Sequence, residues 1–148
     1  MKTRGRGFTL IEIVMVVTLV GVIMTVGIPF FRNATNKQAV RSAMSAMVAM
    51  HARAKSIAIQ RARTTALVLN ASAGTAVIVS SGIGGTVDTL GRVESMAQRF
   101  GVTFTTTQTA LMFSPRGIGT STAGTTIIIT KSGFSDTVTV SAAGRLMQ

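Results

Sequence analysis

The sequence of 148 residues has no cysteine, no tryptophan and no tyrosine, and it has one histidine, His51. Without cysteine the chain forms no disulfide bond and offers no thiolate for catalysis or zinc coordination. Aspartate and glutamate number only four, against 15 lysines and arginines. So few acids, with a single histidine, leave too little for hydrolytic catalysis or for a cage of metal ligands. We therefore expect a protein without catalytic residues, metal or cofactor.

Positive charge and hydrophobicity occur together in this chain. The formal net charge is +11, yet only 13% of the residues are charged and 47% are hydrophobic. Disordered chains combine high charge with low hydrophobicity, so the composition excludes disorder of the whole chain. The length allows one ordinary domain, or a smaller domain with a long appendage.

The hydrophobic residues are concentrated near the N-terminus. Residues 1–7 carry three positive charges, and residues 8–31 contain one charged residue, Glu12. The uncharged part, residues 13–31, is 19 residues long, close to the ~20 that an α-helix needs to cross a bilayer. A cleaved secretory signal is the alternative, although its apolar region would be only about 7–15 residues. We expect residues 8–31 to form a transmembrane helix, whose orientation the flanking charges leave open because they occur on both sides.

Glu12 is the one acid of the apolar segment. A carboxylate at the bilayer centre is disfavoured by roughly 2.5–3.5 kcal/mol, so membrane acids usually have a partner and a role. The alternative is that this acid, one turn inside the boundary, reaches back to the lipid headgroups.

The hexapeptide Gly7-Phe-Thr-Leu-Ile-Glu12, with a basic leader before it and an apolar run after it, resembles the signal of type IV pilins and type II secretion pseudopilins. The resemblance implies that prepilin peptidase cuts after Gly7 and that Phe8 becomes the N-methylated first residue. It implies that Glu12 pairs with the terminal amine of a neighbouring subunit and that Pro29 kinks the helix. It also implies a cytoplasmic leader at the inner membrane, with the remainder in the periplasm.

The physical chemistry of that cleavage is consistent with a partner for Glu12. Cutting before Phe8 creates an ammonium group about four residues, or some 6 Å of helix rise, from the carboxylate. Between staggered subunits the pair would cancel two buried charges, and removing either partner would leave the other uncompensated. Glu12 is therefore expected to set the register of assembly.

Residues 32–63 continue the helical pattern. Apolar residues at spacings of three and four mark one helix face, which comprises Val40, Met44, Met47, Ala54, Ile57 and Ala58. We expect an amphipathic helix that covers the rest of the chain, with Pro29 bending rather than ending it. His51 lies at the edge of the apolar face, where a buried or half-buried side chain is expected rather than a ligand.

Residues 64–148 read as a β-rich head. Residues 64–70 and 75–81 indicate a hairpin, residues 102–104 and 111–113 alternate as half-buried strands do, and residues 125–130 and 136–141 form the clearest strand pair. The linker between the last two is residues 131–135. The glycine-rich loop 82–85 lacks the Lys-Ser/Thr of a phosphate-binding loop. We expect roughly six or seven strands.

The C-terminal half also carries a family resemblance. Phe113-Ser-Pro-Arg-Gly117, Ile127–Ile129, Val138–Ser141 and Gly144-Arg145 look like the pattern of GspH/FimT-type minor pilins and pseudopilins. The resemblance implies a type IV pilin-like α+β fold, with a long N-terminal transmembrane and amphipathic helix followed by a small antiparallel head. Major pilins of this kind often close a C-terminal loop with a disulfide, which this chain cannot form.

The surplus of positive charge suggests an alternative function. Losing residues 1–7 would leave a net charge of +11 − 3 = +8, which attracts phosphates or acidic partners. Some FimT-like proteins are implicated in DNA uptake through a C-terminal Gly-Arg-x-Arg pattern, in which Met147 replaces the second arginine here. The candidate DNA contacts are Arg116, Lys131 and Arg145. The alternative for these residues is a solvated basic surface, or pairing with acidic neighbours in a filament.

The sequence thus predicts a non-enzymatic minor pseudopilin of a type II protein secretion system, in which residues 8–31 pack the core of a periplasmic filament. Its expected partners are other pilins or pseudopilins, prepilin peptidase and the inner membrane, with no small-molecule substrate. The alternative is a FimT-like minor type IV pilin in pilus assembly or DNA binding for natural transformation. A membrane-anchored enzyme is disfavoured because aspartate, glutamate and histidine are so few.

Overall fold

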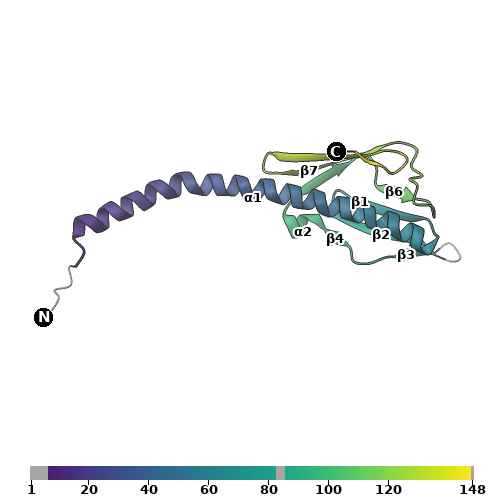
Figure 1. Ribbon diagram of the computed structural model, residues 1–148, viewed down its shortest axis with the longest axis horizontal. Coiled ribbons are helices and arrows are strands. Elements are labelled where there is room, and N and C mark those ends of the chain that lie inside the picture. The colour runs from purple at the N-terminus through teal and green to yellow at the C-terminus, as the bar shows by residue number, and fades with distance from the viewer. Residues whose placement is uncertain (1–6, 83–85, 148) are drawn as a thin grey trace. The chain divides into compact units, whose positions relative to one another are not determined.

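The computed structural model describes residues 7–82 and 86–147, so most of the expected leader and loop residues 83–85 lie outside the described part (Figure 1). The chain divides into two compact units, residues 1–35 and 36–148. Helix α1 (Leu10–Arg61) begins in the first unit and ends in the second. The elements after α1 are β1 (Thr65–Asn70), β2 (Thr75–Ser81), β3 (Val87–Thr89), β4 (Glu94–Ser95), α2 (Met96–Phe100), β5 (Thr103–Thr106), β6 (Ala110–Phe113), β7 (Thr125–Lys131), β8 (Phe134–Val140) and β9 (Leu146–Met147).

The strands of the second unit form two antiparallel sheets. The first has the order β3-β2-β1-β6, with β4 also paired to β2, and the second has the order β5-β7-β8-β9. In the first sheet Leu67 of β1 lies opposite Ile78 of β2 and Leu111 of β6. This register places apolar side chains on one face because residues two apart in a strand share a face.

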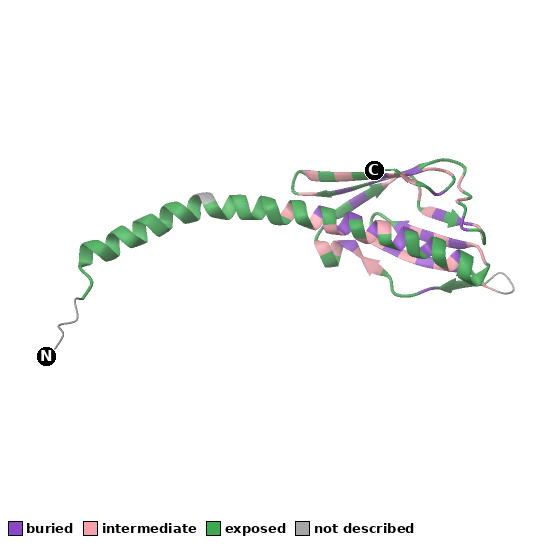
Figure 2. Cartoon of the chain, viewed as in Figure 1, coloured by how far each residue is buried: buried purple, intermediate pink, exposed green. Residues whose placement is uncertain are grey.

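The hydrophobic core lies between the C-terminal part of α1 and the inner faces of both sheets, where buried residues gather (Figure 2). The apolar face expected for α1 is buried, with the exception of Ile57, which is half-buried. In β7 Ile127 and Ile129 are 1% and 0% exposed, whereas Ile128 between them is 36% exposed. Fully burying a side chain of this size stabilises the fold by about 1.5–3 kcal/mol.

The α+β class and the antiparallel head are confirmed, while the detail of the head differs from the expectation. Strands β3, β4 and β9 and helix α2 were not predicted, because elements of two to five residues carry no periodic signal. The linker between β7 and β8 is also shorter than expected, since Lys131 and Phe134 pair within the sheet. Ser132 and Gly133 alone form the turn, with φ of 48° and 86°, as a type I′ hairpin turn requires.

Candidate functional site

Thr9 and Glu12 cap the N-terminus of α1. The Glu12 amide donates to Thr9 Oγ1 at 3.4 Å, and the Thr9 amide donates to Glu12 Oε2 at 3.5 Å. This reciprocal pair is a capping box, which satisfies two amides that the helix leaves without intrahelical partners. The carboxylate therefore points toward the helix N-terminus, the end at which an acid is also favoured by the helix dipole. The Thr-x-x-Glu spacing could have revealed this arrangement.

The polar side chains within the apolar part of α1 form hydrogen bonds inside the helix. Thr18 Oγ1 donates to the Val14 carbonyl at 2.8 Å, and Thr25 Oγ1 donates to the Val22 carbonyl at 2.7 Å. The helix continues through Pro29, whose missing N–H leaves the Thr25 carbonyl without its usual partner. The two hydroxyl groups thus have their acceptors within the helix, as an apolar surrounding would require.

The apolar side chains of this segment are exposed. Phe8, Leu10 and Ile11 are 79%, 83% and 72% exposed, and no described residue of the most hydrophobic 18-residue window is buried. Within the described chain, α1 is the one helix whose length and composition suit a membrane crossing. Such a surface is stable only in lipid or against other apolar helices.

His51 of α1 lies in the core of the second unit. It is 5% exposed, and its ring meets the Phe113 ring edge to face with centroids 5.1 Å apart. Burial lowers the pKa of His51 below 6.5 and the positive charge of Lys55 lowers it further, whereas the nearby Gly144 backbone acts in the opposite direction. No group of three potential metal ligands occurs among the described residues, and His51 packs as the sequence predicted.

Two of the candidate DNA contacts lie on neighbouring loops. Arg116 and Arg145 are exposed, and their loops are joined by the Gly119 amide, which donates to the Ala143 carbonyl at 3.0 Å. Lys131 is half-buried elsewhere, and its Nζ donates to the Phe100 carbonyl at 2.7 Å. The ammonium group of Lys131 thereby satisfies a carbonyl at the C-terminus of α2.

The sequence profile of the family described as type II transport protein GspH matches residues 43–144, more than half of the chain. The chain belongs to the GspH family. A second profile, the prokaryotic N-terminal methylation motif, matches residues 2–28 of this GspH-family chain. The two matches confirm the family resemblance that the sequence suggested.

Solved structures share the fold of this GspH-family chain at low sequence identity. The type IV minor pilin FimU of Pseudomonas aeruginosa superposes with a TM-score of 0.62 at 19% identity, over 76% of this chain and 90% of FimU. The minor pseudopilin EpsH of the Vibrio cholerae type 2 secretion system gives a TM-score of 0.58 at 13% identity, over 74% of this chain and 94% of EpsH. Curated protein sequences give no match. The pilin-like fold is thus shared with minor subunits of two machines.

Proposed function

We propose that this GspH-family chain is a minor pseudopilin, a structural subunit of the periplasmic pseudopilus of a type II secretion system. The observation that carries the proposal is Glu12 at the start of an exposed apolar helix, within the region that matches the methylation motif. The GspH match over residues 43–144 supports secretion rather than pilus assembly. A structural role also agrees with the scarcity of acids and histidine.

Processing would prepare the helix for assembly. Prepilin peptidase would cut between Gly7 and Phe8, and methylation of Phe8 would follow. The new ammonium group would be that of Phe8, directly before Thr9. The Glu12 carboxylate already accepts a hydrogen bond from the Thr9 amide, so it lies at the same end of the helix as the ammonium group. The GspH-family head would then stand in the periplasm while residues 8–31 remain in the inner membrane.

During assembly, contacts between α1 and lipid would be replaced by contacts between helices of different subunits. The exposed apolar side chains of α1 would leave the bilayer and pack against the same segments of other subunits, so contacts with lipid are replaced by contacts of similar polarity. Register would come from the Glu12–ammonium pair, because a wrong stagger would leave two charges uncompensated in an apolar filament core. Pro29 would supply a kink within that segment.

Processing is tested by mass spectrometry of the full chain, expressed with and without a prepilin peptidase. We expect a product that begins at Phe8 and carries one added methyl group, only when the active peptidase is present. A catalytically inactive variant of the peptidase is the control. An intact N-terminus in the presence of the active enzyme would contradict the proposal.

A minor type IV pilin that binds DNA is the second candidate. It is favoured by the exposed Arg116 and Arg145 on adjoining loops and by the similarity of the fold to FimU. Lys131 supports it less, because its ammonium group already binds the Phe100 carbonyl. DNA binding would require these two arginines, whereas the role in secretion proposed above would not. The salt dependence of DNA binding by the chain and by variants without these arginines tests the difference.

A further inference from the structure

We propose that a pocket beside α1 in the head binds an acidic segment of another protein that carries an aliphatic side chain. The pocket has a volume of about 290 Å³ and lies where α1, β2 and α2 meet. We call it the arginine-rimmed pocket, after Arg53, Arg92 and Arg99, which line it. It adds a kind of partner to the filament role proposed above.

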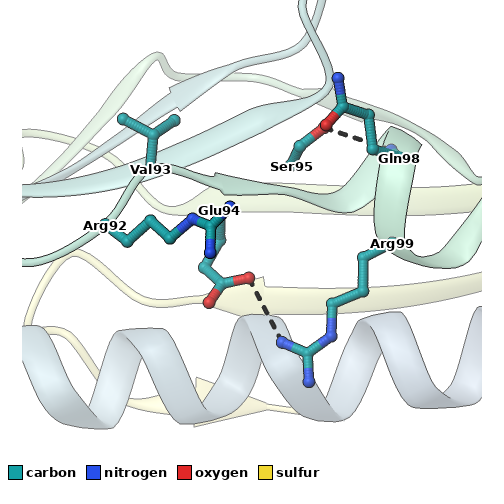
Figure 3. Close-up of a pocket in the computed structure, with 6 residues that line it drawn as sticks. All are labelled: Arg92, Val93, Glu94, Ser95, Gln98 and Arg99. Carbon is teal, nitrogen blue, oxygen red and sulfur yellow. Dashed lines mark hydrogen bonds and ion pairs between the residues drawn. The ribbon is translucent and has the colours of Figure 1, made fainter.

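The rim carries a surplus of positive charge. Glu94 pairs with Arg99 at 3.3 Å (Figure 3), and in the adjoining cavity Asp88 pairs with Arg61 at 3.4 Å. These are the two ion pairs found within the described residues, so Arg53 and Arg92 have no carboxylate partner there. In the lining of the arginine-rimmed pocket three arginines thus face one acid, Glu94, and the surface favours an anionic ligand.

The loop before β4 lies close to one of these arginines. Gly91 has a φ of +91°, and a Cβ added to it would lie 3.4 Å from Nη2 of Arg53. The loop before β4 therefore passes directly beside the Arg53 guanidinium, and Arg92 follows as the next residue. In Figure 3 Arg99 reaches toward Glu94, whereas Val93 points away from it.

The floor of the arginine-rimmed pocket is apolar. Met50, Ile78 and Met96 line it and are 9%, 3% and 1% exposed, and Ala49 of α1 lines it from an exposed position. An apolar floor inside a cationic rim matches a peptide in which an aliphatic residue is flanked by acids. A nucleic acid fits less well, because the lining has no aromatic side chain on which a base could stack.

A second copy of this chain is a poor occupant. Its acids are Glu12, Asp88, Glu94 and Asp136, and Asp88 and Glu94 are already paired with arginines. No two of the four are closer than six positions in the sequence, so no short segment of the chain is acidic. Copies that have lost residues 1–7 would each carry a net charge of +11 − 3 = +8 and would repel each other. The partner is therefore a different protein with an acidic surface segment.

Direct binding of defined peptides tests this inference. The full chain, in nanodiscs of uncharged lipid, is titrated into a fluorescein-labelled peptide Glu-Asp-Leu-Glu-Asp, and in parallel into a peptide with serine in place of leucine. We expect the leucine peptide to bind about tenfold more tightly, because the floor buries its side chain. The Arg53→Gln/Arg92→Gln double variant should bind it about five- to tenfold more weakly.

Matched variants separate the pocket from general attraction to positive charge. Ala49→Leu should weaken binding at least about fivefold by filling the pocket, whereas Ala52→Leu, at an exposed position of the same helix outside the lining, should not. Arg116→Gln/Arg145→Gln should also leave affinity unchanged. Equal losses for the two arginine pairs, equal affinity for the two peptides, or competition by duplex DNA would overturn the inference. Because the measurement needs no processing or assembly, failure here leaves the proposed function standing, and the reverse also holds.

Discussion

His51 and Phe113 pack edge to face across the head core, with ring centroids 5.1 Å apart and planes inclined by 78°. Phe113 in turn contacts the C-terminal loop, since a Cβ added to Gly144 would lie 3.1 Å from its Cε1 atom. His51 Nε2 is buried without a hydrogen-bond partner among the described residues. The contact thus places a titratable ring where a positive charge would be poorly solvated.

The stability of the head should fall in mild acid. The pKa of His51 is lowered in the folded state, chiefly by burial, so the unfolded chain binds a proton more readily below about pH 6.5. Unfolding free energy should then drop, by at most about 1.4 kcal/mol per pH unit, until the folded pKa is passed. Thermal unfolding followed by circular dichroism at pH 7.5 and 5.5 measures the change. His51→Gln should flatten this dependence, and an unchanged slope would contradict the assignment.

Gly119→Ala should destabilise the head by about 2–4 kcal/mol. An added Cβ would lie 2.5 Å from the Gly144 amide nitrogen and 2.6 Å from the Ala142 carbonyl oxygen, and backbone cannot move aside cheaply. Gly133→Ala is the matched control, because no atom lies within 4 Å and only its φ of +86° opposes a side chain. Denaturant unfolding measures the free energy of unfolding of both variants. Similar small decreases would show that the loops around Gly119 can move to accommodate a side chain.

Replacing Glu12 distinguishes its role in the helix cap from its role in assembly. Glutamine also completes a capping box, so Glu12→Gln keeps the cap and loses the charge, whereas Glu12→Ala loses the cap and the charge. We expect membrane insertion to persist in both variants and filament incorporation to fall at least about tenfold in both. Separation of assembled filaments from the membrane fraction measures incorporation. Normal assembly of Glu12→Gln would show that the charge is dispensable.

Lys131→Met should cost the head about 1–2 kcal/mol of stability, because the Phe100 carbonyl loses a charged donor at 2.7 Å. Lys37→Met is the control, since Lys37 is exposed on α1. The melting temperatures of the two variants measure this difference. If they are equal, the hydrogen bond from Lys131 makes no measurable contribution to the stability of the head.

DNA binding, if it occurs, should depend on Arg116 and Arg145. Each phosphate contact contributes about −0.9 to the slope of log affinity against log salt, so Arg116→Gln/Arg145→Gln should reduce the slope by about two. Lys131→Met should leave the slope unchanged. Gel shifts of the full chain with duplex DNA test this, and the absence of a shift at low salt would remove the DNA-binding candidate.

Helix α1 and the long strands could be predicted because their hydrophobic patterns are periodic over many residues. The buried face of α1 follows from spacings of three and four, and β1 and β2 from apolar runs separated by a turn. In contrast, the run Ile127–Ile129 cannot show which side chains face inward, since the packing of one sheet face on the core decides it. Strands as short as β4 and β9 exist only because β2 and β8 offer edges for pairing.

The candidate sites were unequally visible in the sequence. Glu12 stood out because a single acid interrupts an apolar run, and Thr9 could have been added from its spacing. The arginine-rimmed pocket could not be predicted, because Arg53 and Arg92 lie 39 positions apart and meet only through the fold. For Lys131 the sequence shows the charge that made it a candidate DNA contact. It does not show the hydrogen bond to the Phe100 carbonyl, which forms only in the fold.

The strand pairing of the head suggests an order of folding. β1–β2 and β7–β8 are hairpins with short turns, and such hairpins form in about 1–10 μs. The pairing of β1 with β6 joins residues more than 40 positions apart, so it must await closure of a long loop. Two local nuclei would therefore form first, and the arrival of β6, which carries Phe113 onto His51, would complete the core.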